Sequence, residues 1–264
     1  MIKEVKKHLV NQVLPFWMRL KDDKYGGFYG EVDYQGVIKH SAIKGGILNS
    51  RILWFFSNAC LTLKNKEYLT YADHAYRFLK DKFYDPEYGG VYWTVFYDGN
   101  PEDPCKHTYN LAFAIYALAS YFDASGNTEA LSLAYNLFDT IEILCKDDDG
   151  YLEGFERNFQ PTSNEKLSEN GVMAGRTMNT LLHLIEAYTE LYRVDPSEKI
   201  AVCIRNMLDM LAERVYNPKL RRLDVFFDLD WKPLIDLHSY GHDIEASWLV
   251  DRACEVLGDE DYTN

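Results

Sequence analysis

Four groups of polar residues interrupt otherwise apolar stretches of this sequence, and together they could form one functional site. Their side chains could hydrogen-bond a polar ligand, transfer protons or hold a metal ion. The groups are Asn49-Ser50-Arg51, His107-Thr108-Tyr109-Asn110, Asn179 with His183 and Glu186, and the run from His238 to Glu245. Equivalent members recur every 58 to 70 residues. Regular recurrence predicts that the four groups occupy equivalent places around one rim of a repeating structure.

Each of the first three groups also has a purely structural interpretation. Arg51 could pair with a buried carboxylate, and Tyr109 could be a core ring whose hydroxyl caps a helix. Asn179, His183 and Glu186 follow the spacing i, i+4, i+7, which places them on one helix face. Polar side chains on an apolar helix are costly to desolvate unless they find partners, so a satisfied core network is an alternative to a ligand site.

The fourth group contains two histidines on either side of a Tyr-Gly pair. Asp243 could cap a following helix and Glu245 would then lie in its first turn, but capping leaves His238 and His242 unexplained. We therefore predict a functional role for His242. A metal site is the competing interpretation of H-x-x-x-H, but Gly241 interrupts the spacing and no H-E-x-x-H motif is present. The prediction is a site without metal.

Other classes of site and partner receive no support from the sequence. No phosphate-binding glycine loop follows a strand and no G-x-S-x-G nucleophile elbow occurs. A formal net charge of -13 and a pI near 5.0 argue against binding to nucleic acid or to an anionic membrane. The longest apolar run, 111–119, is too short to span a bilayer. The 39 aromatic residues are typical of sugar sites, but also of packing between helices.

Cysteine usage and the N-terminus predict a cytoplasmic protein. The five cysteines are scattered and include no C-x-x-C pair, which indicates reduced, mostly buried thiols. The first residues, MIKEVKKHLV, contain no apolar core of a secretory signal.

The elements that must position the polar groups are predominantly helices. Hydrophobic periodicity predicts helices near 2–20, 44–62, 66–83, 108–124, 128–145, 174–193, 196–215 and 243–257. Aromatic and glycine turns recur between alternate helices: DKYGGFYGEV (23–32), PEYGGVYWTV (86–95), the weaker DDGYLEGF (148–155) and NPKLRRLDVFF (217–227). A period of a little over 60 residues corresponds to one helix pair and a short hairpin.

The helices alternate in character, which predicts two layers. Segments 44–62 and 108–124 are apolar nearly all round, whereas 66–83 and 196–215 carry charge on one face. This pattern predicts an all-α (α/α)6 toroid, with inner helices around a central cavity; an open solenoid is the alternative. About four helix pairs are followed by one further inner helix, whereas six pairs would need roughly 380–400 residues. We therefore expect a single catalytic domain over 1–264 that lacks its C-terminal third.

Several motifs resemble those of one enzyme family. The segments KGGILNSRILWFFSNA (44–59), KHTYNLAFAIYAL (106–118), MNTLLHLIEAYTELY (178–192) and DLHSYGHDIEASWLVDRA (236–253) resemble cellobiose 2-epimerases, part of the wider N-acylglucosamine 2-epimerase superfamily. The resemblance extends over the whole chain. It implies an (α/α)6 barrel, a cytoplasmic isomerase, a disaccharide substrate, and no required cofactor. One departure is Asn49, where histidine is expected in close relatives.

The resemblance also implies a mechanism and roles for individual residues. Ring opening of the sugar acidifies its C2 proton, one imidazole removes this proton to give an enediolate, and a second returns one on the opposite face. His242 would be one of the two proton-transfer histidines, with Glu245 orienting it or the sugar. The second histidine is expected beyond residue 264. The other residues implied to bind the sugar are Arg51 and Tyr109 near O1, Asn179 and His183 in the pocket, and Trp248 against the sugar ring.

Three alternatives remain on sequence grounds. An aldose–ketose isomerase or an N-acylglucosamine 2-epimerase would use the same histidines. A glycoside hydrolase on an α/α toroid would need two opposed carboxylates, whereas Asp243 and Glu245 are neighbours. A non-catalytic repeat scaffold is the third alternative.

Overall fold

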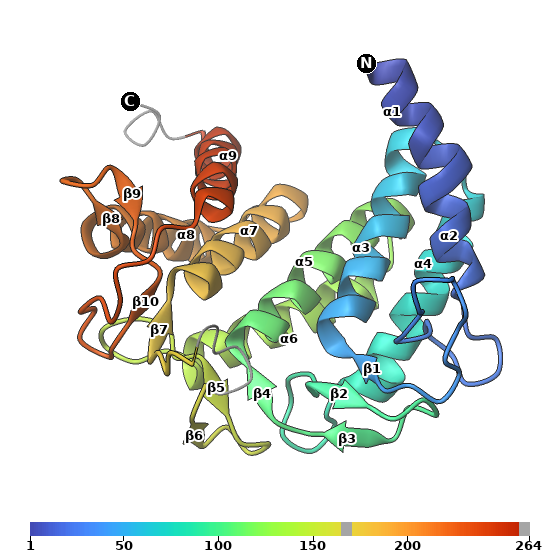
Figure 1. Cartoon of the computed structure of the whole chain (residues 1–264), viewed down its shortest axis with the longest axis horizontal. Coiled ribbons are helices and arrows are strands. Elements are labelled where there is room, and N and C mark those ends of the chain that lie inside the picture. Colours follow the sequence, from blue (N-terminus) through green and yellow to red (C-terminus); the bar gives the residue numbers. More distant parts are fainter. Residues whose placement is uncertain (165–170, 259–264) are drawn as a thin grey trace.

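A computed structural model of the chain describes residues 1–164 and 171–258, and most of them lie in paired helices. Four helices form an inner row in which each contacts the next (Figure 1). The inner helices are α3 (Gly46–Leu63), α5 (Thr108–Ser125), α7 (Met178–Val194) and α9 (Tyr240–Leu257). The outer helices are α1 (Ile2–His8) and α2 (Leu14–Arg19), joined by a π-helical turn over Leu9–Val13, then α4 (Glu67–Phe78), α6 (Thr128–Leu144) and α8 (Glu198–Met210).

This alternation confirms the predicted α/α-toroid architecture. Further π-helical turns over Leu79–Phe83 and Leu211–Val215 extend α4 and α8. Every predicted helix is present, and the largest shifts are at two starts, since α7 begins at Met178 and α9 at Tyr240. The described helices make four outer–inner pairs, so α9 is the inner member of the fourth pair and not a helix additional to it.

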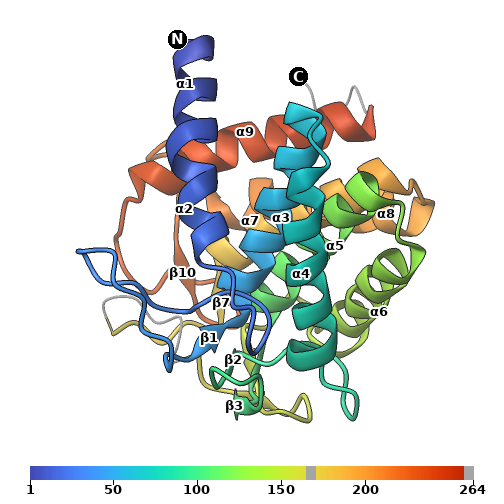
Figure 2. The same ribbon diagram turned by 90° about the vertical axis from the view of Figure 1, so that its right-hand side faces the viewer.

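Short antiparallel strands connect successive repeats at the starts of the inner helices. The strands are β1 (Lys44–Gly45), β2 (Thr94–Val95), β3 (Pro101–Asp103), β4 (Lys106–His107), β5 (Gly154–Phe155), β6 (Pro161–Thr162), β7 (Arg176–Thr177), β8 (Tyr216–Asn217), β9 (Arg222–Leu223) and β10 (Phe226–Phe227). The strand before each of α3, α5 and α7 pairs with a strand of the next repeat: β1 with β2, β4 with β5, and β7 with β10. In Figures 1 and 2, β1–β2–β3 lies at the lower end of α3, where that helix starts. Each repeat is thus fastened to the next.

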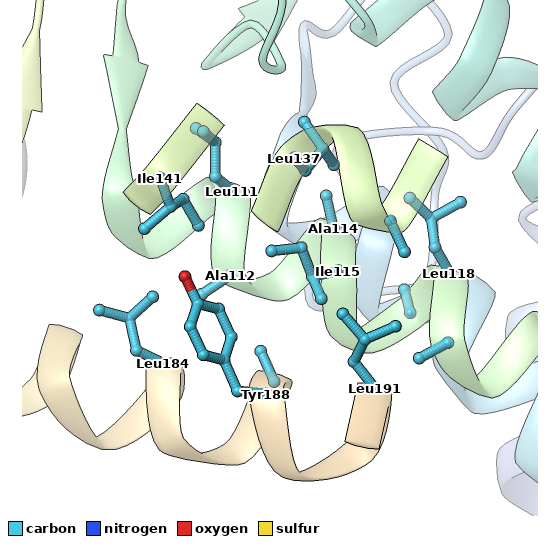
Figure 3. Packing of buried hydrophobic residues seen from close by; sticks show 14 of the residues in the cluster. Leu111, Ala112, Ala114, Ile115, Leu118, Leu137, Ile141, Leu184, Tyr188 and Leu191 are labelled. Carbon is cyan, nitrogen blue, oxygen red and sulfur yellow. The ribbon is translucent and has the colours of Figure 1, made fainter. Parts of the chain in front are cut away.

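Helix α5 forms the centre of the hydrophobic core. Figure 3 shows Leu111, Ile115 and Leu118 of α5 between side chains of α6 and α7, with Ala112 and Ala114 where the backbones approach closely. All five are completely buried. Burying each leucine or isoleucine contributes about 1.5–3 kcal/mol. This packing accounts for a helix that is apolar nearly all round.

An ion pair recurs just before three of the inner helices; both side chains are fully buried in the first two pairs, whereas Asp147 in the third is 40% exposed. In each repeat a cation two residues before the helix contacts an aspartate in the preceding aromatic–glycine turn. The pairs are Lys44–Asp22 at 2.7 Å, Lys106–Asp85 at 3.1 Å and Arg176–Asp147 at 2.7 Å. The same aspartates accept backbone N–H bonds that close the turn. The turns also need glycine: Gly27 has φ of +65°, and a Cβ there would lie 2.5 Å from Phe78.

The Asp85 pair has an additional cation at its rim. Asp85 is completely buried and accepts bonds from Lys106 and, at 2.8 Å, from Arg157. Burial alone would raise the pKa of Asp85, but hydrogen bonds from Arg157, the Glu87 N–H and Lys106 outweigh it and hold the pKa well below its usual range. Burial lowers the pKa of Lys106 to about 8 in spite of the opposing effect of Asp85. The carboxylate therefore stabilises two cations and a turn.

We predict that Asp85→Asn lowers the free energy of unfolding by about 3–5 kcal/mol, because it leaves the buried Lys106 ammonium without its counter-charge. Urea unfolding followed by far-UV circular dichroism measures the loss. Asp139→Asn is the matched control, since Asp139 pairs with Lys199 on the surface and its loss should cost less than about 1 kcal/mol. Equal losses for the two variants would contradict the importance of the buried pair.

Candidate active site

A cavity of about 500 Å³ lies among the inner helices. This volume is in the range of small-molecule sites, and the lining is largely apolar and aromatic with a few charged groups. The lining residues are Trp17 of α2, Leu48, Arg51, Ile52, Trp54 and Phe55 of α3, Phe113 and Tyr116 of α5, His183 and Glu186 of α7, and Glu245 and Trp248 of α9. The cavity is where the inner helices converge.

Arg51 presents a guanidinium group to this cavity. Its Nη2 donates to the Tyr109 hydroxyl at 3.3 Å, and the guanidinium lies 4.3 Å from the centre of the Phe113 ring. Arg51 is exposed and forms no ion pair with a residue in 1–164 or 171–258, so the interpretation as a buried structural pair is wrong. A cationic donor of this kind is suited to bind a ligand oxygen.

Tyr109 connects the Arg51 side of the cavity to α7. Its ring is buried and meets His183 edge to face at 5.1 Å. Burial raises the pKa of Tyr109, with Glu245 and Glu186 adding to the rise and Arg51 and Asn179 opposing it. The hydroxyl is therefore neutral and can donate a hydrogen bond at neutral pH. Its partner is Arg51, so it does not cap a helix.

His183 and Glu186 form a pair on the cavity wall. His183 Nδ1 lies 2.8 Å from Glu186 Oε2, and both side chains are mostly buried. A carboxylate accepts only, so Nδ1 carries a proton, and in the neutral form of the ring Nε2 is an acceptor. Asn179, one turn before His183, is half-buried and its Oδ1 has no partner in the described chain. The stripe on α7 thus includes an acceptor that no group in residues 1–164 or 171–258 satisfies.

The start of α9 places three predicted residues differently. Glu245 and Trp248 line the cavity, and Trp248 remains 51% exposed. His242 lies one turn before Glu245 and is half-buried, but it is not among the lining residues. Its Nδ1 is 2.8 Å from Ser239 Oγ. When Nδ1 donates to that hydroxyl, Nε2 keeps a lone pair that can act as a base.

The interpretation of Asp243 as a helix cap is wrong. The helix starts at Tyr240 with Ser239 as its N-cap residue, so Asp243 lies inside the first turn. Its carboxylate accepts from the Leu223 N–H at 3.1 Å and contacts His238 Nε2 at 2.6 Å. His238 and His242 therefore have separate protein partners, and no group of three or more His, Cys, Asp or Glu in the described chain is placed to hold a metal ion.

Several residues of the predicted clusters do not face the cavity. Asn49 and Ser50 are completely buried beside the strand ends, and Asn110 donates to the Tyr92 carbonyl. His107 packs against Trp93, and burial lowers its pKa to about 4. These side chains help to pack the starts of the inner helices and do not line the cavity.

The sequence interpretation did not select Trp54, Phe113 and Tyr116, and it left Glu186 out of the site. Each of the four lies one or two helical turns after a selected residue. Trp54 follows Arg51 by three, Phe113 and Tyr116 follow Tyr109 by four and seven, and Glu186 follows His183 by three. Helical spacing from the selected residues would have found them.

The helix pairs and the cavity define an α/α-toroid protein with a candidate small-molecule site. A model of the N-acylglucosamine 2-epimerase (GlcNAc 2-epimerase) family matches residues 27–261. The chain belongs to this family.

Individual relatives are also similar. A cellobiose 2-epimerase of Ruminococcus albus is 54% identical over 261 residues, which are 99% of this chain and 67% of that protein. The crystal structure of a sugar epimerase from a ruminal bacterium superposes with a TM-score of 0.98 at 53% identity, over 100% of this chain and 68% of its own. The structure of the cellobiose 2-epimerase of Bacillus thermoamylovorans B4167 superposes with a TM-score of 0.96 at 48% identity. The superposition covers 99% of this chain and 69% of that one. The chain thus spans about two thirds of the length of these relatives.

We predict that Glu186 sets the tautomer of His183. Glu186→Ala should reduce the Nδ1–H form, whereas Glu186→Gln should keep it because the amide oxygen still accepts. Long-range ¹H–¹⁵N NMR correlations of the imidazole ring distinguish the two forms. An unchanged ring pattern in Glu186→Ala would show that another group holds His183.

A second prediction concerns Glu153, which anchors the start of α7. Its carboxylate accepts from the Thr177 N–H at 2.7 Å and the Thr180 hydroxyl at 2.6 Å. Burial raises the pKa of Glu153 from 4.5 to about 7, although these bonds oppose the rise. The folded state then holds the proton more tightly, so the free energy of unfolding falls as pH rises from about 4.5 to about 7.

We expect Glu153→Gln to remove a fall on the order of 3 kcal/mol, since each pKa unit corresponds to about 1.4 kcal/mol. Urea unfolding of both proteins at pH 4.5 and pH 8 measures this difference. Parallel pH profiles would contradict the titration of Glu153 in this range.

Proposed function

We propose that this protein is an isomerase that epimerises C2 of the reducing-end glucose in cellobiose-type β-1,4-linked disaccharides. The observation that carries the proposal is the cavity in which Arg51, His183, Glu245 and Trp248, residues from three inner helices, line one space. The identity to cellobiose 2-epimerases over nearly the whole chain supports the choice of substrate. The aromatic lining suits the apolar faces of sugar rings, and the charged groups suit their hydroxyls.

The proposed chemistry is proton transfer at carbon. The bound sugar opens to its aldehyde, which acidifies the C2 proton. His242 removes that proton through Nε2, while its Nδ1–H is held by Ser239. The resulting enediolate carries negative charge on oxygen and needs donors already in place. Return of a proton to the opposite face of C2 inverts the centre and leaves C1 an aldehyde.

The remaining residues of the site have proposed binding roles. Arg51, with the neutral Tyr109 hydroxyl beside it, binds O1 and stabilises the enediolate oxygen. Asn179 and His183 accept bonds from sugar hydroxyls, and Glu245 orients His242 or the sugar. Trp248 packs against a sugar ring. Each role uses a donor or acceptor atom that the group's contacts within the protein leave free to bind the sugar.

A second proton-transfer histidine completes this scheme. We propose that it belongs to the third of the related proteins that this chain does not cover. The same pair of histidines would serve an aldose–ketose isomerase or an N-acylglucosamine 2-epimerase. Analysis of the product separates these activities: a C2 epimer retains an aldehyde, whereas an isomerase gives a ketose.

The proposal includes a cytoplasmic protein that needs no metal or organic cofactor and binds neither nucleic acid nor membranes. All five cysteines lie in the described residues, where they are buried and form no disulfide, which supports a reducing compartment. No helix of the described chain is long and apolar enough to cross a membrane.

The test is incubation with cellobiose in D2O, followed by NMR of the sugar. This chain is compared with a version extended along its natural reading frame. We expect deuterium at C2 and a mannose-type reducing end from the extended form, and His242→Asn should slow both at least about 100-fold.

Each other outcome decides a different part of the proposal. Exchange and epimerisation by the 264-residue chain would contradict the need for a second histidine beyond it. No exchange from either form would contradict the proposed substrate. A ketose product would replace epimerisation by aldose–ketose isomerisation.

A further inference from the structure

The fourth repeat departs from the aspartate–cation pair that precedes the other three inner helices. Lys44, Lys106 and Arg176 each lie two residues before their helix, and His238 holds the same position before α9. Asn217 stands where the other repeats have the aspartate. Its Oδ1 accepts the Lys219 and Leu220 N–H groups at 3.2 Å, closing the turn as the aspartates do. Both members of the pair are therefore replaced.

His238 takes its carboxylate from α9 instead of from the preceding turn. Its Nε2 lies 2.6 Å from Asp243 Oδ2, and Asp243 Oδ1 accepts from the Leu223 N–H in β9. The side chains of His238 and Asp243 are 31% and 24% exposed, whereas those of Lys44 and Asp22 are fully buried. Asp243 thus connects the segment before α9, the first turn of α9 and the neighbouring hairpin.

The start of α9 lacks the strand that precedes the other inner helices. The starts of α3, α5 and α7 each follow a strand that pairs with the next repeat, whereas residues 235–239 form no strand with the described chain. Ile235 and Leu237 of this segment pack against the core, and the centres of the His238 and Tyr240 rings lie 4.0 Å apart. In place of a strand, the two bonds of Asp243 act together with this packing to orient the turn.

Two neighbouring side-chain bonds join the same pair of segments. His238 contacts Asp243 and Ser239 contacts His242, so residues 238 and 239 are linked to residues 242 and 243. Loss of the His238–Asp243 bond would free the segment that holds Ser239 against His242 Nδ1. We propose that Asp243, paired with His238, is a positioning residue that fixes the ring orientation and tautomer of His242.

The importance of that position for catalysis rests on the proposed function, but the positioning itself can be measured without a sugar. NMR of the His242 ring and amide hydrogen exchange of residues 240–246 report it directly in the 264-residue chain. Ser239→Ala provides the reference signal of a His242 ring that has lost its Nδ1 partner.

We expect Asp243→Ala to move the His242 ring signals toward those of Ser239→Ala. It should also lower amide protection in the first turn about two- to fivefold, the scale of a partly exposed charge pair. His238→Lys should preserve both, because lysine holds this position in two other repeats. Asp243→Asn keeps an acceptor for the Leu223 N–H, so its ring signals and amide protection should lie between those of Asp243→Ala and His238→Lys. Asp251→Asn, an exposed charge on the same helix, is the matched control and should change nothing.

Unchanged His242 signals in Asp243→Ala would overturn the proposal, as would an equal change in Asp251→Asn. A loss of signal dispersion throughout the protein would show a general structural role and would also overturn it. In the extended chain, Asp243→Ala should lower kcat at least fivefold with KM within twofold of wild type. If the ring signals shift but wild type shows no C2 exchange, the proposed function fails while the positioning role of Asp243 stands.

Discussion

The pairing of an aspartate with a lysine or arginine at the start of an inner helix, fully buried in the two lysine pairs, is the interaction on which this architecture depends. One carboxylate oxygen closes an aromatic–glycine turn through backbone N–H groups, and the carboxylate also holds a cation two residues before the helix. A turn of one repeat and a helix start are thereby fixed to each other. An uncompensated charge at such a site costs several kcal/mol, so the pair discriminates strongly against other arrangements.

Because the helix starts are fixed, the first three turns of the inner helices form the cavity. Arg51 of α3, Tyr109 of α5 and His183 of α7 meet there through a hydrogen bond and an edge-to-face ring contact. None of these contacts is strong by itself. Their precision comes from the helices behind them, whose packed leucines and alanines leave few alternative positions. The site is therefore as rigid as the core that supports it.

The start of the fourth inner helix is held by a different ion pair. At α9 the cation is a histidine, its carboxylate partner lies on the same helix, and both side chains are partly exposed. The residues nearest to the proposed proton transfer are thus attached through a connection in which both side chains are partly exposed. A site that must let a sugar open and turn benefits from some freedom at this wall, whereas the pairs before α3 and α5 are fully buried.

The sequence by itself determined the helices, their alternation between inner and outer layers and the groups of polar residues at the inner starts. Hydrophobic periodicity and repeated turns are local properties, so they can be recognised in the sequence alone. It also indicated the family through motifs in four inner segments. Only the tertiary structure decided which members of each group reach the cavity. Arg51 does and Ser50 does not, because successive residues differ by about 100° around a helix and neighbouring elements set the rotation. The partner of Asp243 was equally hidden: a carboxylate near a helix start is typical of a cap, and only the approach of β9 and His238 gave it another role.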